Sequence, residues 1–436
     1  MLNKKGNFLI YFDSFKRDYL SCNVIKIFLE KKGHNVFITS RKNLFFFVNF
    51  LKFDYFIIIN NVFSPFEEKL VKRIKSKIIL IDAEGAMTEE WLDWLLFKNS
   101  GSEIKKRRMK YLFDKSEKIF IWNEYVRNFL LNSGVCNQAN KLAVKGSLKL
   151  SIMHMIKKKN KKFQKTNTIG IISRFLTTND FRNRTTLENI LAMFKNKNIH
   201  NQFYYAEGEI QSIFIFLELI KNIIQNTEYN INIKPHPNEN YDTWKILETK
   251  YPGRVFLCDP EDDFIEWILD KDQIICTPST SLVEAIVADK KIISIHKLLR
   301  VDSNRIYYEN SITGLLERAH KPNTMDEIID CILNKKSFLD EKENLLPEIM
   351  QKYYNFDLNK DYNIANEILE YLNFDEFKNN SLLNVLNPII YFSKNLIDFI
   401  VIKRKGMFSK KNFISNFNDY NYFINKKSLQ IDKVFD

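Results

Sequence analysis

Two halves of the segment 229–285 decide the fold. The first is Tyr229-Asn-Ile-Asn-Ile-Lys234-Pro235-His236-Pro237, and the second is Ile274-Ile-Cys-Thr277-Pro278-Ser279-Thr280-Ser281-Leu-Val-Glu284-Ala285. Each half reads as a short apolar strand that runs into a polar turn, followed by a helix. Ligands of open α/β sheets bind at the carboxyl ends of the strands, so both turns are expected to face one crevice. A cation and an imidazole in one turn, with hydroxyl groups at a helix start in the other, suit a phosphate-bearing ligand.

The rest of the chain repeats the alternation of apolar strands and amphipathic helices. Strands are predicted at 7–12, 34–39, 55–59, 77–81 and 118–122, and again at 168–173, 231–234, 255–258, 273–277 and 291–295. This alternation predicts an α/β fold with parallel sheets. We expect an N-terminal Rossmann-like domain over 1–155, a basic linker over 156–167, a second Rossmann-like domain over 168–355 and a helical extension over 356–436.

The charge balance of the chain indicates which kinds of molecule it can bind. The chain has 436 residues, with 66 Lys and Arg against 53 Asp and Glu, so its formal charge is +13. A basic balance suits anionic partners, although scattered lysines also fit a solvated surface. No recognisable nucleic-acid motif combines these cations with aromatic residues, so we expect no nucleic-acid partner.

The five cysteines and the hydropathy pattern indicate a cytoplasmic protein. The cysteines are odd in number and far apart, without the spacing of a zinc or redox motif. Free thiols of this kind are typical of a reducing compartment. We find no uninterrupted apolar run of about 18 residues, so no membrane-spanning helix is expected.

The first polar turn carries a histidine between two prolines. Pro235 and Pro237 restrain the backbone, which keeps His236 in an extended or turn conformation. An imidazole fixed at a strand end can donate a hydrogen bond to a phosphate oxygen, with Lys234 nearby. The alternative is an ordinary surface turn.

The second polar turn has two compatible interpretations. Ser281 and Glu284 have the spacing of a capping box, which by itself explains much of the pattern. The same helix start favours an anion, held by backbone N–H groups and by Ser279, Thr280 and Ser281. Glu284 would then bind ribose hydroxyls.

Carboxylates are the candidates for a general base. Asp82 and Glu84 follow the strand 77–81 and precede Gly85, and a carboxylate placed there can take a proton from an attacking hydroxyl. The alternative is a turn whose acids cap a helix. Glu207, in Ala206-Glu207-Gly208-Glu209, is a weaker candidate for the same role.

Two further groups are candidate substrate contacts. Arg174 and Arg182 follow the first strand of the second domain and could clamp a phosphate or a sugar carboxylate. Gly146 and Ser147 form a glycine turn at the end of the first domain. Solvated loop arginines and a plain loop are the alternatives.

The segment 381–411 is a candidate membrane-associating element. Thirteen Leu, Ile, Val and Phe residues occur from Ser381 to Ile402, and Lys403, Arg404 and Lys405 follow directly. An apolar helix with a basic flank suits the interface of an anionic membrane. Packing against the body of the protein or against a second subunit is the alternative.

Together these motifs resemble the GT-B glycosyltransferases that make bacterial surface polysaccharides. The likeness covers roughly residues 5 to 335 and is nearest to the sialyl-, polysialyl- and Kdo transferases that use CMP-activated sugars. It rests on Ala83-Glu84-Gly85, His236-Pro237 and Ser279-Thr280. The family's first motif has two acids before its glycine, whereas here Ala83 replaces the leading acid and Asp82 lies one residue upstream.

The resemblance implies a fold, a reaction and a set of roles. The two Rossmann-like domains would face a central cleft and transfer a sialic-acid-like or Kdo-like sugar from CMP to a capsule or lipopolysaccharide glycan. Glu84 or Asp82 would deprotonate the acceptor. His236 and Lys234 would stabilise the CMP phosphate. Such enzymes need neither a metal nor a further cofactor, and their glycan or lipid-linked acceptors place them at the inner face of the cytoplasmic membrane.

Two other functions remain open. The first is a CDP-glycerol or CDP-ribitol polyol-phosphate transferase, which would share the two-domain architecture and the His-Pro motif. The second is a non-catalytic, membrane-bound scaffold of a polysaccharide assembly complex. Binding of a nucleotide would argue against the scaffold.

Overall fold

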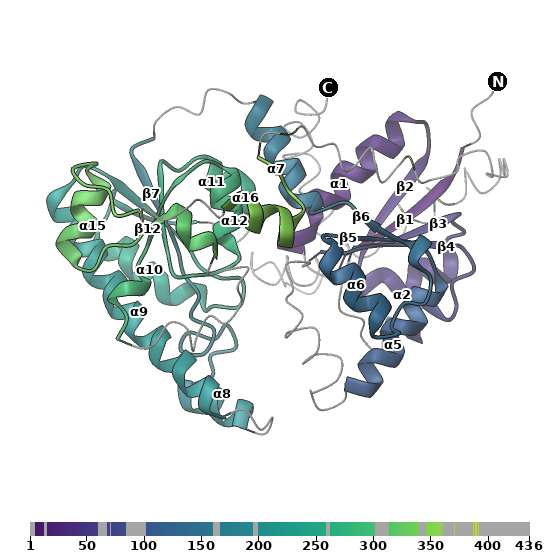
Figure 1. Cartoon of the computed structure of the whole chain (residues 1–436), viewed down its shortest axis with the longest axis horizontal. Helices are drawn as coiled ribbons and strands as arrows, with labels where there is room; N and C mark the ends of the chain where they lie inside the picture. Colours follow the sequence, from purple (N-terminus) through teal and green to yellow (C-terminus); the bar gives the residue numbers. More distant parts are fainter. Residues whose placement is uncertain are drawn as a thin grey trace. The chain divides into compact units, whose positions relative to one another are not determined.

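The structure is a computed structural model of the whole chain. It describes residues 5–12, 15–59, 68–69, 71–83, 102–159, 166–194, 199–258, 262–300, 314–339, 346–358, 360, 370, 387, 389 and 391. The chain divides into two compact units (Figure 1). One comprises Met1–Lys159 with Gln351–Asp436, and the other comprises Asn160–Met350.

The N-terminal unit contains a six-stranded parallel sheet. The strands lie in the order β2-β1-β3-β4-β5-β6, and every described pair is parallel. The strands are β1 Asn7–Phe12, β2 Asn35–Ser40, β3 Tyr55–Ile59, β4 Lys77–Ile81, β5 Ser116–Ile121 and β6 Leu142–Val144. Their helices are α1 Phe15–Lys31, α2 Arg41–Phe50, α5 Ser102–Lys115, α6 Glu124–Asn132 and α7 Leu148–Lys159.

Helices cover both faces of this sheet. Side chains of α2, α5 and α6 form one apolar cluster with the strands, while α1 contacts β1, β2 and α7. Strands covered on both faces are apolar along their whole length, as parallel sheets require. All six residues of β1 are buried accordingly.

The C-terminal unit contains a second six-stranded parallel sheet. Its order is β12-β11-β10-β7-β8-β9. The strands are β7 Thr168–Ile172, β8 Asn230–Lys234, β9 Val255–Leu257, β10 Gln273–Cys276, β11 Lys291–Ser294 and β12 Ala319–His320. The helices are α8 Thr186–Phe194, α9 Ile199–Asn226, α10 Tyr241–Lys250, α11 Phe264–Leu269, α12 Ser281–Val287, α15 Met325–Ile332 and α16 Leu346–Ile349.

The two faces of the second sheet are covered by different helices (Figure 1). α9, α10 and α15 pack on one face through a cluster that includes Ile171, Ile233 and Ile275. α11 lies on the other face, where an added Cβ on Gly170 would lie 2.8 Å from Trp267 and 2.8 Å from Ile274. The close approach of α11 to β7 explains why glycine occupies this strand position.

The predicted α/β fold with parallel sheets is confirmed. The predicted and observed elements differ mainly at two very short strands and one long helix. The predicted strands 55–59 and 77–81 have the observed bounds. β6 and β12 were missed because three and two residues are too few to show a pattern. α9 runs from Ile199 to Asn226, although only its part from 210 to 224 has a strongly apolar sequence, because its first half is more polar.

Two described residues of the C-terminal extension pack on the N-terminal unit. Asn387 donates to the carbonyl of Lys52 (2.6 Å) and accepts from its N–H (3.3 Å). The Tyr391 hydroxyl donates to the carbonyl of Ile38 (3.1 Å), and its ring stacks at 5.1 Å on Phe47. Part of the predicted segment 381–411 is therefore packing surface, and its other residues except Ile389 lie outside the described part.

No helix within the described ranges is both long and apolar enough to cross a membrane. All five cysteines are buried thiols, and none of them forms a disulfide.

Candidate functional site

Strand order brings the two predicted polar turns and the loop after β7 to one edge of the second sheet. Read from β9, the order is that of a doubly wound sheet, and it reverses between β7 and β10. Such a switch point opens a crevice at the carboxyl ends of the strands. The loop after β7 lies there between the His236 turn after β8 and the Ser279 turn after β10. Since neighbouring strands lie about 4.8 Å apart, the two predicted turns begin roughly 10 Å apart.

The His236 turn holds its imidazole in a defined state. His236 Nδ1 accepts a hydrogen bond from the backbone N–H of Asn238 (3.2 Å). A neutral imidazole that accepts at Nδ1 carries its proton on Nε2, so Nε2 is the donor nitrogen. The ring is half-buried, and Pro237 beside it is exposed. This turn can therefore present one N–H donor at the sheet edge.

Lys234 is directed toward β9. Its Nζ donates to the carbonyl of Asp262 (2.7 Å) and to Cys258 Sγ (3.1 Å). Burial raises the pKa of the Cys258 thiol to about 11, although the Lys234 charge opposes the shift. The lysine amine thus has protein partners in addition to any phosphate it would contact.

The predicted capping box at the start of α12 is wrong. The helix begins at Ser281 and its N-cap is Thr280, which is exposed and makes no capping hydrogen bond with the described residues. Ser281 is therefore the first helical residue, and a cap reaching from Ser281 to Glu284 is one position out of register. Glu284 is buried in the first turn of the helix, at 9% exposure.

Ser279 is the residue of this turn with an unsatisfied group. Its side chain is 6% exposed, and its Oγ has no hydrogen-bond partner among the residues that the structure describes. A buried hydroxyl without a partner costs about 1–3 kcal/mol, which a ligand oxygen could recover. The placement next to the switch point is consistent with an anion contact.

The loop after β7 contains both predicted arginines. Arg182 is paired within its own loop, because its Nε and Nη2 lie 3.0 and 2.9 Å from Asp180 Oδ2. Arg174 is half-buried and forms no ion pair within the described ranges. Of the two, Arg174 is the better placed to receive an anionic ligand.

Glu207 lies on a helix and not at a strand end. The motif Ala206-Glu207-Gly208-Glu209 falls inside α9, where Glu207 is exposed and accepts from Gln211 (3.3 Å). Glu209 faces inward instead. It accepts from the N–H groups of Thr177 and Thr178, both at 2.9 Å. Burial raises the pKa of Glu209 to about 7, against these hydrogen bonds.

Sequence reasoning missed Glu239, which follows His236 by three residues. Its carboxylate is 4% exposed and accepts from groups of the loops after β7 and β8. The sequence does show an acidic residue here, in the polar turn that precedes α10. An acidic residue just before a helix is usually a solvent-exposed capping residue, so the sequence did not indicate that Glu239 is buried.

Among the N-terminal candidates, Asp82, Gly146 and Ser147 are described. Asp82 follows β4, and its N–H donates to the carbonyl of Phe120 (2.9 Å). Gly146 has a φ of +82°, a conformation that favours glycine. Ser147 is buried, and its Oγ accepts from the N–H of Leu150 (3.3 Å) at the start of α7. Glu84 and Gly85 lie outside the described residues.

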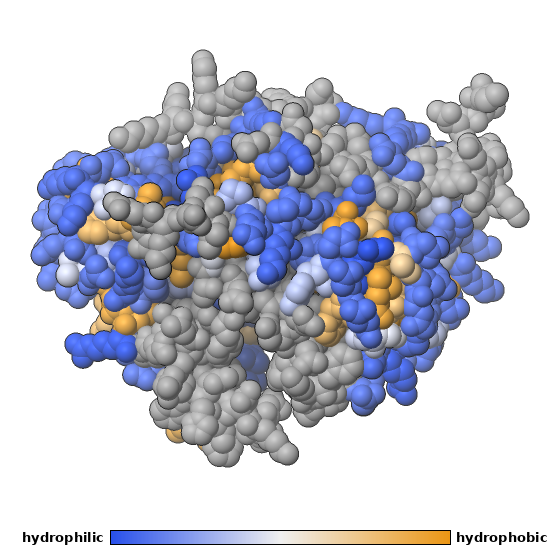
Figure 2. All heavy atoms as spheres, viewed as in Figure 1, coloured by the Kyte–Doolittle hydropathy of each residue, from blue (hydrophilic) through white to orange (hydrophobic). Residues whose placement is uncertain are grey.

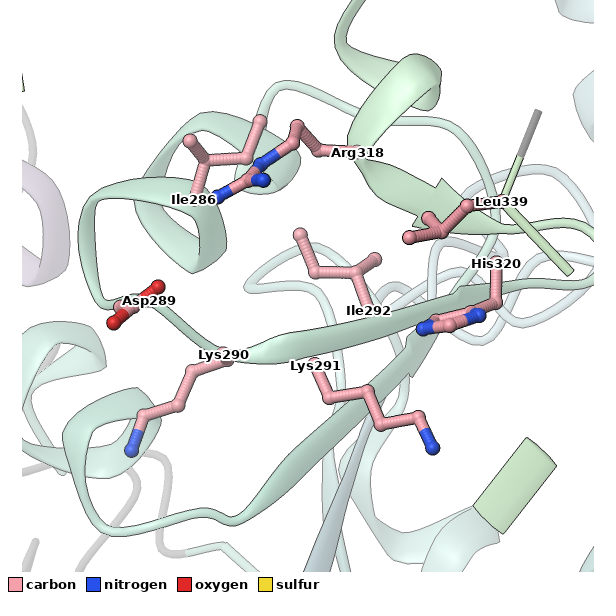
Figure 3. Close-up of a pocket in the computed structure, with 8 residues that line it drawn as sticks. All are labelled: Ile286, Asp289, Lys290, Lys291, Ile292, Arg318, His320 and Leu339. Atoms are coloured by element: carbon pink, nitrogen blue, oxygen red, sulfur yellow. The ribbon is translucent and has the colours of Figure 1, made fainter. Parts of the chain in front are cut away.

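A separate pocket of about 230 Å³ lies at the C-terminal end of α12 (Figure 3). In that view the side chains of Lys290 and Lys291 extend away from Ile286 and Arg318. The Lys290 amine donates to the carbonyl of Leu269 (2.7 Å), and the Lys291 amine donates to Asn334 Oδ1 (2.7 Å). Because both lysine amines already donate to protein acceptors, they do not make this pocket a strong site for an anion.

No group of three or more His, Cys, Asp and Glu side chains that could hold a metal occurs in the part of the chain that the structure describes.

Comparisons with known proteins identify similar folds. No protein-family model and no curated protein matches the chain. The wall teichoic acid polymerase TagF has a similar structure, with a TM-score of 0.52 and 10% identity over 83% of this chain and 88% of that one. UDP-GlcNAc 2-epimerase from Neisseria meningitidis, bound to UDP-GlcNAc, gives a TM-score of 0.47 and 15% identity over 84% and 98%. The chain therefore has an α/β fold of the GT-B type, built from two parallel-sheet units.

Proposed function

We propose that this protein is a GT-B glycosyltransferase that moves a sialic-acid-like or Kdo-like sugar from a CMP-activated donor to a surface glycan, in a capsule or a lipopolysaccharide. The observation that carries the proposal is the state of His236. Its Nδ1 accepts from the N–H of Asn238, so the ring in its neutral form would carry its proton on Nε2, at the carboxyl edge of the sheet. A fixed donor aimed at a departing phosphate stabilises the charge that develops there.

The groups around His236 suit the rest of a nucleotide phosphate. Ser279 contributes a buried hydroxyl on the other side of β7, and Arg174 contributes a guanidinium from the loop between them. Thr280 and Ser281 add backbone N–H groups at the start of α12. Together these groups would hold the phosphate without a metal ion.

The reaction would be a substitution at the anomeric carbon. A carboxylate of the N-terminal unit, Glu84 or Asp82, would take the proton of the acceptor hydroxyl. The acceptor oxygen would then bond to the anomeric carbon, while the bond from that carbon to the CMP phosphate breaks. The electron pair would leave with the phosphate oxygen, which His236 would stabilise by its Nε2–H.

Nucleotide choice tests the donor. A ligand at 100 times its dissociation constant stabilises the native state by about 2.7 kcal/mol. We expect CMP to raise the melting temperature more than CDP, UDP, GDP or ADP does. A preference for UDP would overturn the CMP donor, and no response to any nucleotide would favour the scaffold.

The likeness to TagF favours one second candidate. A polyol-phosphate transferase that uses CDP-glycerol or CDP-ribitol would make a teichoic-acid-like phosphodiester. It would release CMP as well, so the thermal shift alone does not separate the two functions. A turnover assay separates them. In the presence of an acceptor glycan, the enzyme should release CMP either from a CMP-sugar or from CDP-glycerol or CDP-ribitol, but not from both classes of donor.

A substitution tests the role of His236. We expect His236→Ala to lower turnover by about 100-fold, the cost of one preorganised donor. The matched control is His320→Ala, because His320 Nδ1 also accepts a backbone N–H, from Phe338 at 3.1 Å. His320 lines the pocket beyond the C-terminal end of α12, away from the His236 turn. Equal losses in both variants would contradict the assignment.

We further propose that the N-terminal unit binds the anionic inner face of the cytoplasmic membrane. Figure 2 shows mostly hydrophilic residues on the described surface of the viewed face, with hydrophobic residues in separate areas. On α2, Phe45 and Phe50 are 50% and 59% exposed. The guanidinium of Arg73 lies 5.2 Å from the centre of the Phe45 ring. Exposed aromatic rings beside cations suit an anionic lipid surface.

The C-terminal extension would strengthen this contact. Tyr391 packs on Phe47 of α2, and the sequence continues to the basic residues Lys403, Arg404 and Lys405. Each cation near an anionic leaflet adds about 1 kcal/mol. Truncation after Asp375 should weaken co-sedimentation with anionic vesicles, and salt should weaken it in the full chain. If the truncated protein instead unfolds or splits a dimer, the extension serves packing rather than membrane binding.

A further inference from the structure

Glu239 is a buried carboxylate with an unusual number of donors. It lies between the His236 turn and α10 and is 4% exposed. All the described partners of its carboxylate oxygens donate to them. They are Ser173 Oγ (2.9 and 3.0 Å), the N–H of Phe175 (3.1 Å), Asn179 Nδ2 (3.4 Å), the N–H of His236 (3.0 Å) and Trp244 Nε1 (2.9 Å).

These donors come from three different elements. Two backbone and two side-chain donors belong to the loops after β7 and β8, and the indole belongs to α10. The same loops are also joined by backbone hydrogen bonds, from Phe181 to Asn238 (3.0 Å) and from Asn240 to Asn179 (2.7 Å). One carboxylate therefore ties together the two loops that border the candidate phosphate site.

The contact with His236 is reciprocal. Glu239 Oε1 accepts from the N–H of His236, while the carbonyl of His236 accepts from the N–H of Glu239 (2.9 Å). The backbone N–H and the backbone carbonyl of His236 are thus both hydrogen-bonded to Glu239. The ring is oriented by the same turn, through Asn238.

We propose that Glu239 is the positioning residue that holds His236 and the loop after β7 in the arrangement required for phosphate contact. The inference rests on the proposed function for the role of His236, but the structural coupling does not depend on it. An acceptor with two oxygens and no proton can satisfy all five donor groups. A glutamine amide would direct an N–H₂ against some of them, so Glu239→Gln should loosen the turn without removing volume.

The charge balance supports this role. Burial raises the pKa of the Glu239 carboxyl, and the hydrogen bonds from His236, Trp244, Phe175 and Ser173 lower it. Each described donor to the Glu239 carboxylate is neutral: a hydroxyl, an amide, an indole and two backbone N–H groups. The neutral donors therefore offset part of the cost of burying this carboxylate, and the loss of their acceptor should be felt in both loops.

Nuclear magnetic resonance of histidine-labelled protein tests the coupling directly. The chain has six histidines, and His236→Ala assigns the His236 ring signals. We expect wild-type ring nitrogen shifts typical of a proton on Nε2, and a clear change of the His236 signals in Glu239→Gln. The matched control is Glu248→Gln, because Glu248 accepts the backbone N–H of Leu257 (2.6 Å) away from the turn. Unchanged His236 signals in Glu239→Gln would overturn the proposal.

A double-mutant cycle tests whether the effect on turnover passes through His236. We expect Glu239→Gln to lower kcat by about 10-fold in the wild type and by less than about 3-fold in the His236→Ala background, as for coupled neighbours. Equal losses in both backgrounds would overturn the proposal. If His236→Ala alone leaves turnover unchanged, the proposed function fails, whereas the ring signals still decide the positioning role.

A second variant covers the case in which Glu239→Gln does not fold. Ser173→Ala removes one donor and leaves the carboxylate and its other partners in place. It should shift the His236 signals in the same direction by a smaller amount. The absence of any shift in a folded Ser173→Ala protein would contradict the coupling between the two loops.

Discussion

Replacing Glu209 with glutamine tests whether this half-buried carboxyl makes the stability of the C-terminal unit depend on pH. Burial raises the pKa of Glu209 from 4.5 to about 7, and the negative charge of Glu239 acts in the same direction. Hydrogen bonds from Thr177 and Thr178 oppose the shift. The folded protein therefore binds this proton more tightly than the unfolded chain does.

The sign and size of the effect follow from linkage. Below pH 4.5 the carboxyl is neutral in both states, so its full contribution to stability is present. As the pH rises, the unfolded state releases its proton first, and the contribution is lost until the folded group ionises near pH 7. One pKa unit corresponds to 1.36 kcal/mol, so the loss amounts to about 3 kcal/mol.

Equilibrium urea unfolding at several pH values measures this contribution. Glutamine at position 209 does not ionise, so the stability of Glu209→Gln relative to wild type should rise by about 3 kcal/mol between pH 4.5 and pH 7. Glu207→Gln is the matched control, since Glu207 lies on the same helix and is exposed. Its profile should follow that of wild type within about 0.5 kcal/mol. A flat difference for Glu209→Gln would show that the threonine donors offset the burial.

Three other outcomes are expected. Gly170→Ala should lower the free energy of unfolding by about 1–3 kcal/mol, because its Cβ would lie 2.8 Å from both Trp267 and Ile274, and an unchanged urea midpoint would contradict the close packing of α11 on β7. Tyr391→Phe should cost about 1 kcal/mol by removing the hydrogen bond to Ile38, and calorimetry would show whether the extension stabilises the N-terminal unit. The five buried cysteines should react with a thiol reagent only after unfolding, and rapid reaction of the native protein would refute their burial.

The sequence alone determined the elements and the chemistry of the turns. Apolar runs such as 55–59 and 77–81 are local signals, because a strand covered on both faces must be apolar throughout. The prolines around His236 likewise act through their own backbone geometry. The two-unit α/β fold and an imidazole held in a turn at a strand end could therefore be expected before the structure was known.

The tertiary structure decided which side chains share a site. Strand order places β7 between β8 and β10, and no local pattern encodes the pairing of strands that are distant in the sequence. Helix register decided that Glu209 is half-buried while Glu207 is exposed, and it moved the cap of α12 to Thr280. The burial of Glu239 depends on donors contributed by three elements. Residue type reveals a carboxylate, but only the packing of those elements determines whether it meets water or five donors.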